Sequence, residues 1–287
     1  MRDRVRCSPY LRVAIASLLL VAAALASSKP SDAELAAITG RGIFLAEYDV
    51  AAWRATDAVK AAHPEEGLVS RYIARKAEAG WVVDFGRLND SGDKFFVAYE
   101  AIQIGSSARF RVENFDPARE DTGWNLAAAR GIETAMRDLG GTSRLYNISV
   151  LPADHESFYV YLYPAQVKTG VYPLGADVRY HVSRDGTKVI EKRQMHKTII
   201  ESVPGRKDVK VAVGYHSHVL SDLPEDTDVF LVLTRKPGVP EIVVAGAYMF
   251  TIDVNGKITA EDRPKPKEHA VSEPLYPKTG ASNKSKQ

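Results

Sequence analysis

The chain has 287 residues, of which 38 are basic and 36 are acidic, so its net charge is close to neutral. Its hydrophobic content of 45% is typical of a globular protein and excludes a disordered or fibrous chain. The charge balance also argues against a strongly basic face, so we expect no nucleic-acid partner.

The two ends of the chain differ from its body. Four arginines precede an uncharged run, residues 13–26, which ends in Ala-Leu-Ala. This pattern predicts a cleaved signal peptide over residues 1–26 and a periplasmic or secreted protein. An uncleaved anchor is the alternative, but the run is shorter than the roughly 20 residues that span a membrane, so we expect no membrane span after cleavage. Residues 263–287 are rich in proline and basic residues and predict a disordered tail.

Cleavage would also remove Cys7, the only cysteine. The mature chain would then contain no disulfide and no thiolate metal ligand. We therefore expect its stability to come from packing of the core, which a body of this length is large enough to provide.

Two amphipathic helices are predicted in the body. Asp49 is expected to cap the first, which ends at His63-Pro64, and the second covers residues 122–139 and stops at Gly140-Gly141. Because each has one apolar face, each should lie against a sheet.

Runs with strand character follow each helix, and their short connections require antiparallel neighbours. The first set covers residues 72–76, 81–88, 95–104 and 109–115, and the second covers 145–151, 157–163, 177–183 and 187–195. A third block covers 209–218, 229–234, 242–254 and 257–259. We therefore predict an α+β fold with mostly antiparallel sheets, in which two helix-plus-meander units are followed by a third β-rich block. The units would cover residues 27–120 and 121–262, the second including the C-terminal block.

A His-x-His motif, His216-Ser217-His218, is the sharpest local feature. The period of a strand places both imidazoles on one face, about 7 Å apart along the strand. Two imidazoles and a carboxylate such as Asp228 would give a divalent metal such as zinc three ligands and leave one position open. His196 is a further candidate ligand from a neighbouring strand. The alternative is that the histidines only form hydrogen bonds with the backbone and nearby carboxylates.

This segment resembles the metal-binding segment of JAMM/MPN-type zinc isopeptidases, whose pattern is H-x-H, seven residues, then S-x-x-D. The resemblance implies that His216, His218 and Asp228 bind zinc. The spacing here is six residues, and Glu225 stands in the serine position. No residue matches the general-base glutamate of that family, and Glu191 and Glu201 are the candidates on earlier strands.

A second resemblance extends over nearly the whole mature body. Residues 52–57, 80–88, 163–180 and 185–197 are similar to an uncharacterised family of exported bacterial proteins. This similarity implies export and the predicted fold. It implies no activity and no site.

Tyr159, Tyr161 and Tyr163 share one face of a predicted strand. Such a stripe either forms a binding surface for sugars, peptides or proteins, or lies beneath a helix. The usual catalytic motifs are missing from the sequence. Our leading hypothesis is therefore a non-enzymatic binding or interaction module of the bacterial envelope, or secreted from it, with a protein, peptide or envelope ligand as partner. The alternative is a zinc-dependent hydrolase whose metal activates a water molecule.

Overall fold

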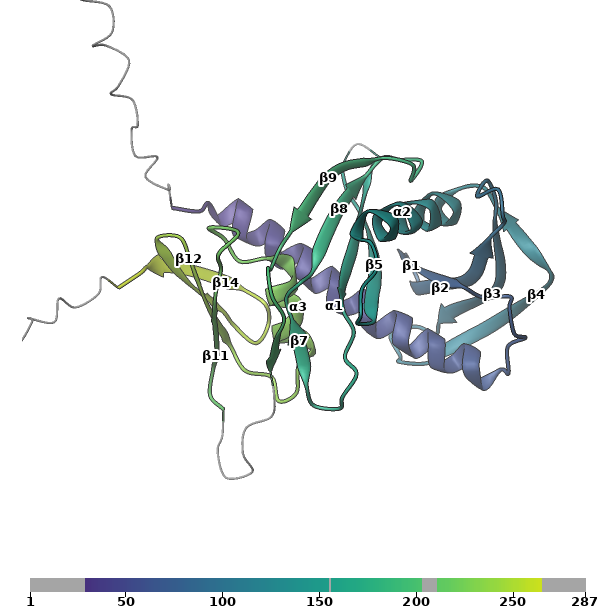
Figure 1. Ribbon diagram of the computed structural model, residues 1–287. Coiled ribbons are helices and arrows are strands. Elements are labelled where there is room, and N and C mark those ends of the chain that lie inside the picture. The colour runs from purple at the N-terminus through teal and green to yellow at the C-terminus, as the bar shows by residue number, and fades with distance from the viewer. Residues whose placement is uncertain (1–28, 155, 203–210, 265–287) are drawn as a thin grey trace, which may run out of the picture.

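The computed structural model describes residues 29–154, 156–202 and 211–264. The expected signal peptide and most of the expected tail lie outside these ranges. The predicted class is confirmed, because the described chain is α+β and its sheets are mostly antiparallel (Figure 1). The helices are α1 (Asp32–Ala61), α2 (Trp124–Leu139) and α3 (Asp226–Thr234).

The strands form three four-stranded sheets and one small pair. The N-terminal sheet contains, in spatial order, β1 (Arg71–Ala77), β2 (Gly80–Leu88), β3 (Phe95–Gln103) and β4 (Phe110–Asp121). The middle sheet contains β5 (Tyr146–Pro152), β6 (Phe158–Pro164), β8 (Val178–Val182) and β9 (Val189–Gln194). The C-terminal sheet contains β11 (Gly214–Ser217), β12 (Glu241–Ala245), β13 (Tyr248–Ile252) and β14 (Ile258–Asp262). The pair is β7 (Tyr172–Leu174) with β10 (Ile200–Ser202).

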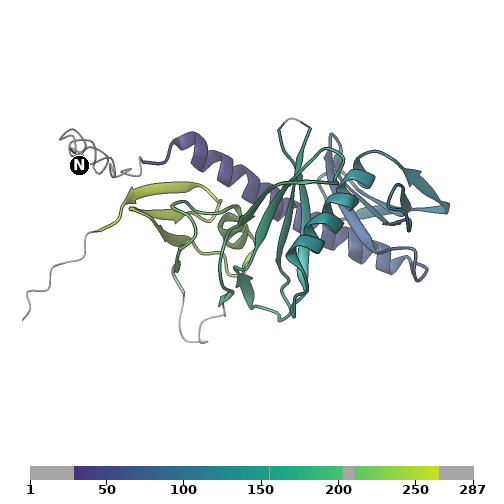
Figure 2. The same ribbon diagram turned by 45° about the horizontal axis from the view of Figure 1, so that its top comes forward.

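Helix α1 has 30 residues and is therefore roughly 45 Å long. It runs past all three large sheets, from the C-terminal sheet at one end to the N-terminal sheet at the other (Figures 1 and 2). The predicted start at Asp49 is wrong, because the helix is capped by Ser31. The Ser31 hydroxyl accepts the Glu34 N–H at 3.2 Å, and the Glu34 carboxylate accepts the Ser31 N–H at 2.9 Å.

The hydrophobic cores explain why the long helices are stable. Helix α2 lies between the N-terminal and middle sheets, where Ile132 packs with Phe95 and Phe158. The second half of α1 covers the other face of the N-terminal sheet, and its first turns pack on α3 and the C-terminal sheet. Because α1 is buried against different partners along its length, it lacks the single apolar stripe that would reveal it in the sequence.

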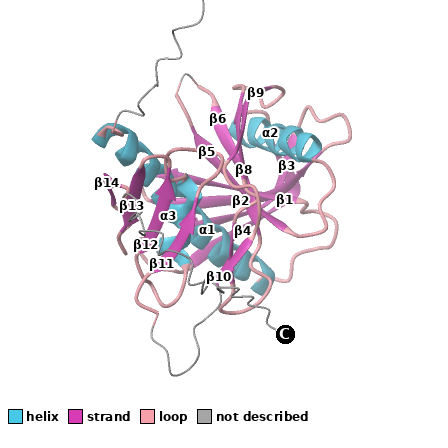
Figure 3. Ribbon diagram, turned by 60° about the vertical axis from the view of Figure 1, so that its left-hand side comes forward, coloured by secondary structure: helices cyan, strands magenta, loops and turns pink. Residues whose placement is uncertain are grey.

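The C-terminal block differs from the prediction in two ways. Residues 229–234 belong to helix α3 and not to a strand, and the predicted strand 242–254 is the two strands β12 and β13. Strand β11 pairs with β12 in parallel, and α3 forms the crossover between them (Figure 3). None of the helices in the described ranges is both long and apolar enough to cross a membrane.

Candidate metal centre

The structure buries most of the tyrosine stripe of β6. Tyr161 and Tyr163 are 0% and 5% exposed, and they pack with Leu45 of α1 and Phe230 of α3. The Tyr161 hydroxyl donates to Asp226 at 2.8 Å. These two rings therefore belong to the core and do not form the exposed binding surface considered from the sequence. Tyr159 is half-buried.

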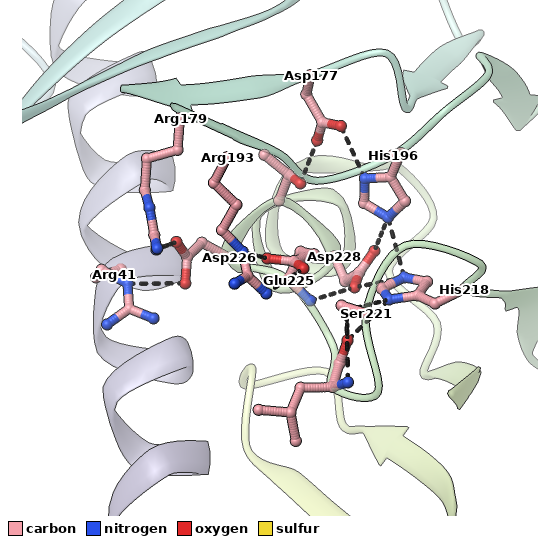
Figure 4. Close-up of polar contacts among 12 residues, drawn as sticks. Arg41, Asp177, Arg179, Arg193, His196, His218, Ser221, Glu225, Asp226 and Asp228 are labelled. Atoms are coloured by element: carbon pink, nitrogen blue, oxygen red, sulfur yellow. Dashed lines mark hydrogen bonds and ion pairs between the residues drawn. The ribbon is translucent and has the colours of Figure 1, made fainter. Parts of the chain in front are cut away.

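Four candidate metal ligands meet where the middle sheet approaches the C-terminal sheet. His196 follows β9, His216 lies in β11, His218 follows β11, and Asp228 lies in the first turn of α3. Figure 4 shows His196, His218 and Asp228. One ligand atom from each lies within 4.8 Å of the other three. The two histidines of the His-x-His motif share the inner face of their strand, whereas Tyr215, which directly precedes His216, is 66% exposed.

Five distances within this cluster are close to those of a tetrahedral site. The Nε2 atom of His218 lies 3.0 Å from that of His196 and 3.2 Å from that of His216. The Asp228 carboxylate lies 3.0, 3.1 and 3.2 Å from the Nε2 atoms of His216, His196 and His218. Bonds of 2.0–2.1 Å to a tetrahedral zinc ion place neighbouring ligand atoms about 3.3 Å apart.

The other nitrogen of each ring faces an acceptor. His196 Nδ1 lies 2.8 Å from Asp177 Oδ1, and His216 Nδ1 lies 2.8 Å from Glu241 Oε1. His218 Nδ1 lies 2.8 Å from the carbonyl oxygen of Leu223. A carboxylate or carbonyl oxygen accepts hydrogen bonds, so each Nδ1 must carry the proton.

In their neutral form, the three rings would direct their Nε2 lone pairs toward one another and toward the Asp228 carboxylate. Lone pairs held 3.0–3.2 Å apart repel unless a proton or a metal ion lies between them. The Nδ1 contacts to Asp177, Glu241 and the backbone are those that orient histidine ligands in metal sites. The cluster thus has both the ligand atoms and the supporting contacts of a metal centre.

Protons are the other means of relieving this repulsion. Burial opposes the charged form of His196, but its hydrogen bonds to Asp177 and Asp228 outweigh burial and raise its pKa to about 10. Burial likewise opposes the charged form of His216, and its bonds to Asp228 and Glu241 raise its pKa to about 9. Burial alone would raise the pKa of Asp228, but the bonds from the histidines hold it well below its usual value. Without a metal ion, the cluster therefore favours protons on the histidines, where they balance the charge of the Asp228 carboxylate as a bound cation would.

The cluster is closed to solvent. The exposed fractions of the side chains of His196, His216, His218 and Asp228 are 9%, 3%, 1% and 0%. With His196 as a fourth ligand, the protein itself completes a tetrahedral set. Closed four-ligand sites are typical of structural zinc, whereas catalytic zinc keeps a position for water.

The glutamates considered as a general base lie away from this cluster. Glu191 of β9 is exposed, and Glu201 of β10 forms an exposed ion pair with Arg144 at 3.0 Å. Of the buried glutamates near the cluster, Glu241 binds His216 and Arg235, and Glu225 receives two hydrogen bonds from Arg193. Glu241 and Glu225 thus hold neighbouring side chains in place, and neither takes the position of the general base that the isopeptidase pattern implies.

Comparison with models of known protein families, with curated proteins and with solved structures finds no match for this chain. The functional argument therefore depends on the geometry of the cluster.

Proposed function

We propose that this protein binds one zinc ion through His196, His216, His218 and Asp228, and that the ion is a structural clamp in a non-enzymatic binding protein. The single observation that carries the proposal is the convergence of three Nε2 atoms and one carboxylate on one buried point. The basic and apolar pattern of residues 1–26 supports export, so the proposed setting is the periplasm or the outside of a bacterial cell.

The ligand set supports zinc over the common hard cations. Magnesium and calcium prefer oxygen ligands and six or more of them, whereas three imidazoles and one carboxylate suit a tetrahedral borderline ion. A clamp of this kind would serve a chain whose predicted mature form has no cysteine. The bound ion would take the place of a disulfide in joining distant segments.

The hydrolase alternative makes a different demand on the same residues. It needs zinc held by three ligands, with water in the fourth position. The place of His196 in the cluster, 3.1 Å from Asp228 and 3.0 Å from His218, supports a filled fourth position. The coordination number of the metal therefore separates the two functions.

The first test measures metal content. The purified chain is incubated with zinc, desalted and analysed, together with His216→Ala, His218→Ala and the surface control His63→Asn. We expect one zinc per chain in the wild type and the control, and loss of zinc from the two cluster variants. A wild-type chain that takes up no zinc, or cluster variants that keep it, would contradict the proposal.

The second test examines the fourth ligand by cobalt substitution, because the visible spectrum of Co²⁺ reports its coordination. Added azide should leave the spectrum of the wild type unchanged, since all four positions are occupied by the protein. The His196→Ala variant should bind azide and change its spectrum. An azide response in the wild type would instead indicate an open position and favour the hydrolase.

A further inference from the structure

Three arginines from three different elements converge beside the metal cluster, at the start of α3 (Figure 4). Arg41 comes from α1, Arg179 from β8 and Arg193 from β9. They meet the carboxylates of Glu225 and Asp226, which are 3% and 1% exposed. The arginines thus lie at a junction of α1, the middle sheet and α3.

The carboxylates hold the guanidinium groups in place. Asp226 accepts from Arg41 Nε at 2.9 Å and from an Arg179 terminal nitrogen at 2.7 Å. Glu225 accepts from Arg193 at 3.0 and 2.7 Å. Two buried carboxylates at the start of α3 fix these positions, so a ligand would meet preorganised donors.

The arginines retain unused donors. Among the described residues, Arg41 donates only through Nε, so both of its terminal nitrogens are available to a ligand. Arg193 donates to Glu225 through Nε and one terminal nitrogen, so its other terminal nitrogen is available. The three guanidinium groups face the two buried carboxylates, and Glu34 is a further carboxylate at the same cavity. The side chains of Arg41 and Arg193 are 29% and 35% exposed, so a dissolved ion can reach them.

A cavity of 210 Å³ opens at this position. All three arginines line it, while Ala37 and Ile38 of α1 and Leu223 and Pro224 provide apolar walls. Glu34 also lines it, but its carboxylate is bound by the backbone and hydroxyl of Ser31. The cavity therefore combines forked cationic donors with a small apolar wall.

We propose that this cavity binds a small oxyanion, the carboxylate or phosphate end of a small molecule, with Arg41 and Arg193 as the principal contacts. Guanidinium groups match both anions because they present parallel N–H donors to two oxygens. The inference names the ligand class of the binding role proposed above, and it does not require the metal.

The test titrates inorganic phosphate and acetate separately into the full chain by calorimetry. Saturable binding of one or both is expected, and the comparison distinguishes a phosphate ligand from a carboxylate ligand. Arg41→Gln should weaken the binding about tenfold or more, the effect of one lost charge-assisted hydrogen bond. Saturable binding of neither ion would overturn the proposal.

A second variant avoids the ion pairs and therefore the risk of misfolding. Ala37→Leu keeps a good helix-forming residue on the exposed surface of α1 but fills the cavity, so it should abolish binding. Ala36→Leu is the matched control, because Ala36 is also exposed on α1 but does not line the cavity, and it should bind normally. Undiminished binding by Ala37→Leu would place the ion elsewhere and refute the site. Zinc content, measured on the same samples, would reveal a failure of the metal proposal separately.

Discussion

At the scale of single residues, Asp84 of β2 is a buried carboxyl group outside the metal cluster whose pKa is clearly shifted. It is fully buried and lies opposite Glu100 in the N-terminal sheet. Burial raises its pKa to about 6, although Asn125 donates to it at 2.9 Å. Burial also opposes ionisation of Glu100, but the hydrogen bond from Arg119 at 3.0 Å outweighs it, and the pKa of Glu100 is lowered.

The sign of the pH dependence follows from the raised pKa of Asp84. Between about pH 4 and pH 6 the unfolded chain ionises this carboxyl group, while the folded chain keeps its proton, so the free energy of unfolding falls as the pH rises. Asp84→Asn removes this titration, and its amide can still bond Asn125 and Glu100. Relative to wild type, the variant should gain about 2–3 kcal/mol of stability between pH 4 and pH 7, measured by urea unfolding. The exposed control Asp90→Asn should follow the wild type, and identical profiles for Asp84→Asn and wild type would contradict the assignment.

At the scale of elements, the crossing of α1 and α3 depends on Gly42. A β-carbon at this position would overlap Val229 and lie 2.7 Å from the carbonyl oxygen of Asp226. Gly42→Ala should therefore destabilise the protein by about 1–3 kcal/mol and weaken zinc binding, because Asp228 lies on the displaced turn of α3. A β-carbon at Gly40 would meet no atom within 4 Å, so Gly40→Ala should stabilise α1 by about 0.5–1 kcal/mol. Urea unfolding and a zinc titration check both variants, and equal effects of the two substitutions would refute the close packing.

The elements also show where sequence reasoning succeeds and where it fails. Regular patterns, such as those of α2 and β8, are visible because each of these elements has one more deeply buried face. Helix α3 was predicted as a strand because its run of apolar residues, Val229 to Leu233, is buried on most sides, and periodicity does not separate such a helix from a buried strand. The capping pair of Ser31 and Glu34 was a local signal for the start of α1, but Gly40 and Gly42 interrupt the helical pattern that follows it.

The residues of the candidate site also differ in how far the sequence could predict them. His216, His218 and Asp228 could be selected because they are close in the chain and because strand periodicity places the two imidazoles on one face. His196 could only be named as a possible neighbour, since its position depends on how the end of β9 packs against the C-terminal sheet. The partners Asp177 and Glu241 had no signal in the sequence, because their contacts to the histidines exist only after the sheets are assembled.

At the scale of the whole molecule, the proposed zinc ion would join the middle sheet, through His196, to the block formed by β11, α3 and β12–β14. The N-terminal sheet contributes none of the four ligands, and it packs around its own contacts with α1 and α2. Zinc at a hundred times its dissociation constant would stabilise the folded chain by about 2.7 kcal/mol. This stabilisation should be concentrated in the block that the ion holds. While the ion is bound, local opening of that block must break metal bonds, so removal of the ion should make opening easier there than elsewhere.

Hydrogen exchange measured with and without a chelator tests this distribution. Chelation should accelerate exchange of the amides of β11, α3 and β12, while those of β1–β4 should change little. His216→Ala should already exchange rapidly in the C-terminal block and should not respond to the chelator. A uniform change across all sheets would mean that the ion stabilises the molecule as one cooperative unit. An unchanged pattern in the zinc-loaded wild type would mean that the cores and ion pairs hold the two sheets together without it, and that the cluster has another purpose than clamping.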